Sequence, residues 1–293
     1  MGDVHDASYY AKCMVGGIFA CGITHAAVCP LDIVKCRMQA NPGMYKSIPD
    51  GFKQIKATEG FKGFTLGWFP TLLGYGMQGF GKFGFYEMFK DVYKAALGDK
   101  AAEYQTVGFL VSSACAEVIA DVMLCPMEAL KVRMQTSDKG TFPETAREGW
   151  PKIMNSEGWA GFYKGIKPLW FRQVPYTMVK FGAFENTVKA FYANIFTAPK
   201  SSYSKSTQLM ITFMSGYFAG IFCAIVSHPA DTMVSIMNKK GGTAGEIYKD
   251  IGFNGLWKGL GARIFMIGTL TGLQWYIYDS FKVAVGLATT GGK

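Results

Sequence analysis

The sequence predicts an all-α membrane protein of six transmembrane helices in three tandem, pseudo-symmetric repeats. A Pro-x-acid pattern occurs three times, at Pro30, Pro126 and Pro229, which are 96 and 103 residues apart. A fixed internal period of this size indicates repetition of one structural unit. An apolar stretch precedes each copy, and only 17% of the residues are charged, against roughly a quarter in soluble proteins.

Each repeat is expected to hold two long helices joined by a loop with a short amphipathic helix, with boundaries at 1–97, 98–200 and 201–293. The first long helices are expected at 9–39, 105–135 and 207–238. The 22 residues of 206–227 include no charged side chain, and 13–31 is interrupted only by His25. About 20 such residues cross a bilayer as a helix. The motif prolines lie late in these helices, so a kink is expected at each.

The other helices are shorter or less apolar. The short helices are expected at 49–58, 143–155 and 243–249, and the second long helices at 70–93, 168–193 and 262–285. Ionisable residues in the latter must face a water-filled cavity or another helix, because charge is costly in lipid. The loops within repeats carry more Lys and Arg than the segments on the opposite side, which indicates that both termini lie opposite these loops.

Composition excludes several classes of function. The seven cysteines lack the spacing of a disulfide or zinc framework, so we expect no metal site; a soft-metal role for Cys21 and Cys29 is the alternative. The net charge of +9 favours anionic lipid or an anionic solute over nucleic acid. With no nucleophile–base set and no Gly-rich nucleotide loop, we expect neither an enzyme nor a cofactor. Segment 1–10 is unlike a transit peptide, so targeting is internal or a presequence has been removed.

A second motif follows each short helix. It reads Glu59-Gly60 in the first repeat and Glu157-Gly158 in the second, and Ile251 replaces the acid in the third. Together with three copies of Pro-x-[Asp/Glu]-x-x-[Lys/Arg], the third degraded, this motif makes the whole chain resemble the mitochondrial carrier family.

Four stretches are similar to phosphate-transporting members of that family: 79–87, 175–181, 227–231 and Thr24-His25. The resemblance implies the six-helix mitochondrial carrier fold in the inner mitochondrial membrane, with both termini on the intermembrane-space side. It implies import of inorganic phosphate with a proton, equivalent to exchange for hydroxide, through a cavity that opens alternately to either side. Transport of another small anion or of copper stays open, as does a non-transporting membrane interaction or pore component.

The family pattern also assigns charged residues to a matrix gate. Its members are Asp32, Lys35, Glu128, Lys131 and Asp231, with Gln39 and Gln135 as braces. The resemblance suggests the pairs Asp32–Lys131 and Asp231–Lys35. Glu128 lacks its partner, because Val234 stands where the third base would be.

A cytoplasmic gate is implied on the second long helices. Its members are Glu87, Lys90, Glu185, Asp279 and Lys282, and Val188 replaces one base. The expected pairs are Glu185–Lys282 and Asp279–Lys90. Each partly solvated pair contributes about 1 kcal/mol, which suits a gate that must open. The alternative is that these charges only fix helix packing.

Repeats that bind an asymmetric solute must differ where they touch it. Aligned on the acids of the second long helices, Lys82, Lys180 and Gln274 are equivalent, and Gln78 and Arg172 lie one and two turns earlier. Cations inside apolar helices need an anion or a partner, and a small tetrahedral anion needs a few convergent cations and donors. We therefore expect these five residues to bind substrate; the alternative is that Lys82 and Lys180 neutralise local acids.

A proton carrier is expected from His25, Glu117 and Asp121. The two acids are four residues apart on one helix face, where like charges disfavour double ionisation. Histidine has the side chain whose unperturbed pKa lies nearest neutrality. The alternative for His25 is an ordinary packing residue.

Lys164-Gly165 and Lys258-Gly259 resemble the helix ends at which members of the family bind cardiolipin. The equivalent segment of repeat 1 is Thr65-Leu66-Gly67, which has no lysine. Helix N-termini with a nearby lysine bind phosphate groups readily. We expect cardiolipin as a bound lipid, no nucleic-acid partner and a monomer.

Overall fold

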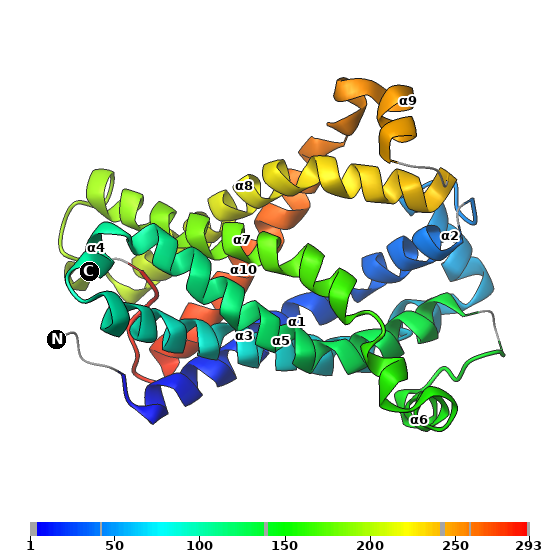
Figure 1. Ribbon diagram of the computed structural model, residues 1–293, viewed down its shortest axis with the longest axis horizontal. Coiled ribbons are helices and arrows are strands. Elements are labelled where there is room, and N and C mark those ends of the chain that lie inside the picture. The colour runs from blue at the N-terminus through cyan, green and yellow to red at the C-terminus, as the bar shows by residue number, and fades with distance from the viewer. Residues whose placement is uncertain (1–4, 42, 138–139, 241–243, 258, 292–293) are drawn as a thin grey trace.

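The computed structural model describes residues 5–41, 43–137, 140–240, 244–257 and 259–291. Within these ranges the chain is helical and has no strand. Figure 1 shows long helices running along one axis, with the described residues nearest the two chain ends at one end of the bundle and the short helices at the other. We call these the terminal end and the short-helix end.

Six long helices form the bundle. The first helices of the three units are α1 (Ala7–Ala40), α5 (Gln105–Thr136) and α8 (Lys205–Lys240), and the second are α3 (Trp68–Leu97), α7 (Ile166–Asn194) and α10 (Leu260–Ala284). These bounds agree with the expected helices to within a few residues. Three helices among the described residues are long and apolar enough to cross a membrane, over Ala7–Met38, Gln105–Thr136 and Lys205–Met233.

The short-helix end carries α2 (Ile48–Thr58), α6 (Ala146–Tyr163) and α9 (Ala244–Leu256). The hydroxyls of Ser47 and Thr145 cap α2 and α6 by accepting backbone N–H groups three residues on. The second and third short helices are longer than expected, because a further helical segment follows Gly158 and Gly252, whose φ values are +62°. In repeat 1 the turn at Gly60, with φ of +66°, instead leads into a 3-10 helix, η1 (Gly60–Thr65).

Two minor elements at the terminal end were not expected from the sequence. They are the one-turn helix α4 (Lys100–Glu103), between α3 and α5, and the 3-10 helix η2 (Lys200–Ser202), between α7 and α8. Both lie in the connections between repeats.

Glycine lets α1 and α3 approach each other closely. A Cβ atom on Gly17 would overlap the backbone carbonyl of Gly79, and one on Gly79 would overlap the carbonyl of Gly17. Small residues at such crossings are what permits close helix packing in lipid. This crossing brings α3 close enough to α1 for their side chains to meet at the centre of the bundle.

An arginine–glutamate clamp ties each of the first two short-helix units to its long helix. Arg37 of α1 binds both carboxylate oxygens of Glu59 at 2.6 and 3.0 Å, and Arg133 of α5 binds those of Glu157 at 2.5 and 2.9 Å. Both arginines lie seven residues after the motif proline. In repeat 3 that position is Ile236 and the acid is Ile251, so both members of the clamp are replaced together.

Gly17→Ala is expected to destabilise the folded protein, since the new methyl group meets backbone that cannot move aside. The cost is about 1–3 kcal/mol, typical of overpacking. Thermal unfolding in detergent, followed by reaction of the buried cysteines with a thiol-reactive dye, measures it. Gly261→Ala is the matched control, because a Cβ atom there meets open space on α10; equal melting temperatures for the two variants would contradict the assignment.

Glu59→Gln is expected to cost about 2 kcal/mol, because it leaves the largely buried guanidinium of Arg37 without its charged partner. The same unfolding assay measures the change. Ile251→Val, at the equivalent position of repeat 3, should lie near the wild type, since no clamp exists there. A Glu59→Gln protein as stable as wild type would show that the clamp contributes nothing.

Candidate functional site

A polar group lies at the centre of the otherwise apolar bundle, and we call its members Gln78, Lys82, Glu117, Asp121, Lys180 and Gln274 the central cluster. All six side chains are at most 4% exposed. Lys82 Nζ pairs with Glu117 Oε2 at 2.9 Å. Gln78 Nε2 donates to Glu117 Oε1 at 2.9 Å and to Asp121 Oδ1 at 3.0 Å. The structure thus brings the predicted substrate-binding and proton-coupling residues of α3 and α5 together.

The other half of the central cluster joins α7 and α10. Lys180 Nζ donates to Gln274 Oε1, and Gln274 Nε2 lies 3.3 Å from Thr24 Oγ1 and 3.4 Å from His25 Nδ1. His25 Nδ1 also lies 2.8 Å from the Cys21 carbonyl oxygen, which fits an N–H donated to that oxygen. The imidazole stacks on Tyr75, with ring centroids 3.8 Å apart. His25 therefore touches the cluster through Gln274.

Arg172 lies apart from the central cluster. It is eight residues before Lys180 on α7, or about 12 Å along the helix. It lines a cavity of about 850 Å³ between α5, α7 and α8, together with Glu128, Tyr176 and Asp231. Five expected substrate residues thus divide into four at the centre and one nearer the short-helix end.

Aromatic rings close the bundle on the terminal side of the central cluster. The six rings occupy two equivalent sets of positions, Phe83, Phe181 and Trp275, and Tyr86, Phe184 and Tyr278. All are at most 1% exposed. Phe184 stacks on Trp275 at 3.5 Å, and Phe83 lies 4.2 Å from Tyr278. This layer was not predicted from the sequence, because each aromatic residue alone is typical of a hydrophobic core. The pattern that could have predicted it is the recurrence of aromatic residues one and four positions after Lys82, Lys180 and Gln274.

The charges beyond the aromatic layer pair differently from the expectation for the cytoplasmic gate. Lys90 Nζ lies 3.0 Å from both Glu87 Oε1 and Glu185 Oε1. The predicted pairs Glu185–Lys282 and Asp279–Lys90 are therefore wrong for this conformation. The Tyr86 ring on α3 contacts that of Phe181 on α7, and its hydroxyl donates to the same Glu185 oxygen at 3.2 Å.

Asp279 and Lys282 have other partners at this end. The carboxylate of Asp279 accepts hydrogen bonds from Thr212 of α8 and from Thr290 beyond α10. Lys282 donates to Thr290 Oγ1 at 3.2 Å, and Tyr9 donates to Glu87 at 3.0 Å. The residues of the predicted gate are thus gathered at one end of the bundle, but in a different pairing.

One predicted pair is present at the short-helix end. Lys131 Nζ lies 2.7 Å from Asp32 Oδ2, which links α5 to α1, and 3.0 Å from Glu128 on its own helix. Gln135 Nε2 donates to the Leu66 carbonyl at 3.1 Å, so it bridges repeats 1 and 2. The side chain of Gln39 lies outside the described residues.

The predicted pair Asp231–Lys35 is not formed. Asp231 pairs with Arg263, on the facing helix α10 of the same repeat, and Arg263 also lies 2.9 Å from Ser227 Oγ. Lys35 Nζ lies 3.1 Å from the sulfur of Met266. Asp231 binds Arg263 in place of Lys35, because the guanidinium of Arg263 lies close to it. Arg263 belongs to no repeated motif.

The predicted lipid-binding residues have mixed surroundings. Lys164 pairs with Glu157 at 2.5 Å, and hydrogen bonds from Arg133 and then Lys164 hold the pKa of Glu157 at about 2. Gly165 lines the cavity at Arg172, Gly259 precedes α10 with φ of +88°, and Lys258 lies outside the described residues.

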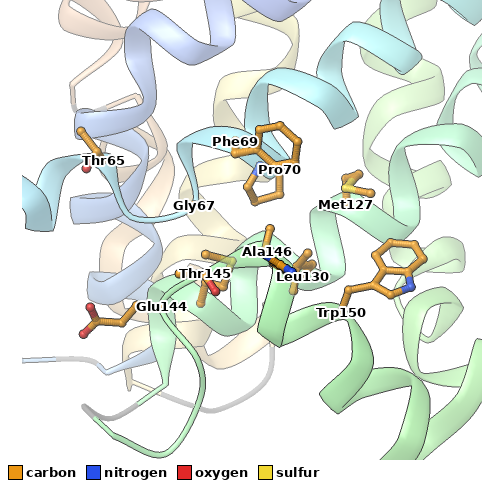
Figure 2. Close-up of a pocket in the computed structure, with 12 residues that line it drawn as sticks. Thr65, Gly67, Phe69, Pro70, Met127, Leu130, Glu144, Thr145, Ala146 and Trp150 are labelled. Atoms are coloured by element: carbon orange, nitrogen blue, oxygen red, sulfur yellow. The ribbon is translucent and has the colours of Figure 1, made fainter.

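A second cavity, of about 520 Å³, lies between the start of α3 in repeat 1 and helices α5 and α6 of repeat 2. Figure 2 shows Gly67, Phe69 and Pro70 at the start of α3 facing Thr145 and Ala146 at the start of α6. Two helix N-termini and apolar walls meet here. This pocket lies at the segment that lacks the lysine of the other two repeats.

Comparison with known proteins agrees with this architecture. The family model described as mitochondrial carrier protein matches residues 6–96, 102–194 and 205–287. The chain is 53% identical, over 98% of its length and 94% of the relative, to a probable mitochondrial phosphate carrier protein of Schizosaccharomyces pombe. It is 56% identical to a mitochondrial phosphate carrier protein of Caenorhabditis elegans, over 95% and 82%.

A human relative, solute carrier family 25 member 3, is 52% identical over 96% of this chain and 78% of its own length. The family-model matches cover nearly the whole chain, and the resemblance seen in the motifs agrees with them. The chain therefore belongs to the mitochondrial carrier protein family.

Proposed function

We propose that the chain imports inorganic phosphate together with a proton across the inner mitochondrial membrane by alternating access. The observation that carries the proposal is the pair of buried lysines in the central cluster. Lys82 is paired with Glu117, whereas the Lys180 ammonium binds the amide oxygen of Gln274 and has no carboxylate partner within the described part of the chain. A buried ammonium without a counter-charge is costly, so an anion beside Lys180 is favoured. The names of the fission yeast and nematode relatives support phosphate as that anion.

Arg172 acts first in this proposal. It lies in the cavity at the short-helix end, where a guanidinium can hold phosphate by two parallel hydrogen bonds. The cavity also reaches Tyr176 and Val179, one turn and one residue from Lys180. Phosphate thus moves along one face of α7 between Arg172 and the central cluster.

The charge balance of the central cluster supports coupling to a proton. When both acids are ionised and no solute is bound, the two lysines and two carboxylates sum to zero. When one acid holds a proton and H₂PO₄⁻ binds beside Lys180, the sum is again zero. Both mobile forms are then neutral, so neither is driven by the membrane potential, which otherwise costs about 2.3 kcal/mol per charge per 100 mV.

Glu117 and Asp121 are the acids that hold this proton. Both accept from the single amide nitrogen of Gln78, and the Oδ2 atom of Asp121 is buried with no hydrogen-bond partner among the described residues. Like charges this close disfavour double ionisation, so one proton stays with the pair until Lys180 loses its anion. His25, in contact with Gln274, completes the group of proton-coupling residues.

We infer that the structure represents a state closed at the terminal end, in which the Lys131–Asp32 pair still joins two repeats at the short-helix end. The aromatic layer and the ion pairs of Lys90 close the terminal end, while the large cavity lies on the other side. We infer six membrane spans, with the short-helix end at the matrix and both termini in the intermembrane space. In the opposite state, Lys35 and Asp231 are free to pair, as the resemblance implies.

Cardiolipin and a monomeric carrier belong to the same proposal. The pocket of Figure 2 offers N–H groups from two helix N-termini beside apolar walls, which suits a phosphate headgroup with acyl chains. No nucleic acid is expected. Transport of another small anion or of copper, and a non-transporting role, are the competing hypotheses, and competition for uptake distinguishes them.

The decisive experiment is uptake of labelled phosphate into liposomes that contain the purified protein. Uptake is expected to rise when the interior is made alkaline and to be insensitive to a valinomycin–potassium potential. Folded protein that takes up no phosphate would refute the substrate, and a response to the potential would refute electroneutral coupling. Unlabelled sulfate and copper serve as competitors.

Glu117→Gln is expected to abolish gradient-driven uptake, because an amide can neither release the proton nor balance Lys82. The same liposome assay measures the loss, and thermal unfolding checks that the variant is folded. Glu103→Gln on α4, which changes an exposed carboxylate, is the matched control and should transport normally. Normal stimulation of the Glu117→Gln protein by the pH gradient would remove Glu117 from the relay.

A further inference from the structure

The segment after α10 folds back into the terminal end of the bundle. Gly286, with φ of +80°, turns the chain, and Thr289 and Thr290 are only 5% and 4% exposed. We call residues 285–291 the C-terminal tail. Because two threonines of a segment without regular structure are this deeply buried, the tail must pack in a specific position on the bundle.

Asp279 accepts the hydrogen bonds that hold Thr290 of the tail in this position. The Thr290 N–H donates to the two carboxylate oxygens at 3.0 and 2.9 Å, and Thr290 Oγ1 donates to Oδ1 at 2.6 Å. Lys282 Nζ donates to the same hydroxyl at 3.2 Å. Thr290 therefore stands between an acid and a base of the predicted cytoplasmic gate and binds both.

Other residues hold the backbone of the tail. Lys200 of η2 donates to the carbonyl oxygens of Thr289 and Gly291 at 2.7 and 2.5 Å. Gln208 of α8 accepts from the Thr289 hydroxyl at 3.2 Å. The tail thus bridges the ends of α8 and α10.

The tail lies where the repeat pattern lacks a base. Val188 is the repeat-equivalent of Lys90 and Lys282, and a Cβ atom on Gly291 would come within 2.7 Å of its Cγ1 and 3.4 Å of Glu185 Oε2. Among the described residues, Asp279, the repeat-equivalent of Glu87 and Glu185, is the gate acid that has no lysine within ion-pair distance. A neutral donor from the tail occupies the place that an ammonium would otherwise take.

We propose that the C-terminal tail is the third part of the terminal-end gate, with Thr290 as the positioning residue that holds Asp279 while this end is closed. Opening of the end requires Asp279 to leave Thr290. The inference rests on the proposed function only in that the carrier alternates between two open states; it does not depend on phosphate as the solute.

Two native cysteines report on the two ends. Cys13 is fully buried near Tyr9 and Tyr278 at the terminal end, and Cys125 is buried beside the motif proline toward the short-helix end. The rate at which a charged, membrane-impermeant methanethiosulfonate reagent modifies each one is measured by mass spectrometry. The protein is held in lipid nanodiscs, where both faces are accessible, and no phosphate is added.

Truncation after Leu287 and Thr290→Val are compared with wild type and with Thr290→Ser, which keeps the hydroxyl. Loss of a hydrogen bond to a charged group shifts such an equilibrium roughly tenfold, so Cys13 modification is expected to accelerate by about that factor in the truncated protein. A smaller increase is expected for Thr290→Val, whose N–H still donates. Thr290→Ser should behave as wild type.

A faster reaction at Cys13 without a faster reaction at Cys125 supports the proposal. Unchanged Cys13 rates in the truncated protein overturn it. Acceleration at both cysteines also overturns it, because loss of the tail has then loosened the whole fold rather than one gate. Phosphate uptake by the wild-type protein is measured separately, so failure of the substrate assignment stays distinguishable from failure of the gate.

Discussion

Charge buried at the middle of an apolar bundle is the constraint on which the rest of the structure depends. Lysines and carboxylates there remain ionised only while each has a partner, because the surrounding side chains and lipid cannot solvate them. Lys82 has Glu117, both acids have Gln78, and Lys180 is left to an amide. In the proposed function, an anion beside Lys180 completes the site, and its binding is coupled to the protonation of the two acids.

The same constraint explains the layers above and below the site. Water that reached the central cluster from both ends at once would let ions leak across the membrane. The rings of Phe83, Phe181 and Trp275, and those one turn further on, fill the bundle toward the terminal end. Toward the other end the walls part around a large cavity. The structure thus has packed aromatic rings on one side of the polar centre and, on the other, a cavity that reaches Val179, the residue before Lys180.

Much of this arrangement could be predicted from the sequence, because internal repetition makes each position informative three times. The long helices followed from apolar stretches, and Asp32–Lys131 from the motif. The pairing of Asp231 could not be predicted, since Arg263 belongs to no repeated pattern. The partners of Asp279 could not be predicted either, since Thr212 belongs to no repeated motif and Thr290 follows the last long helix. Symmetry predicts what the repeats share, whereas local partners decide where they differ.

Departure from symmetry also has a mechanical consequence at the short-helix end. Repeats 1 and 2 are braced by Arg37–Glu59 and Arg133–Glu157, while repeat 3 has isoleucine at both positions. A cavity of about 850 Å³ borders that repeat, between α7 and α8. Stiffness is thus unevenly distributed around the bundle. If repeat 3 is the most compliant third, we expect the passage to widen by a one-sided tilt of this repeat rather than by equal movement of all three.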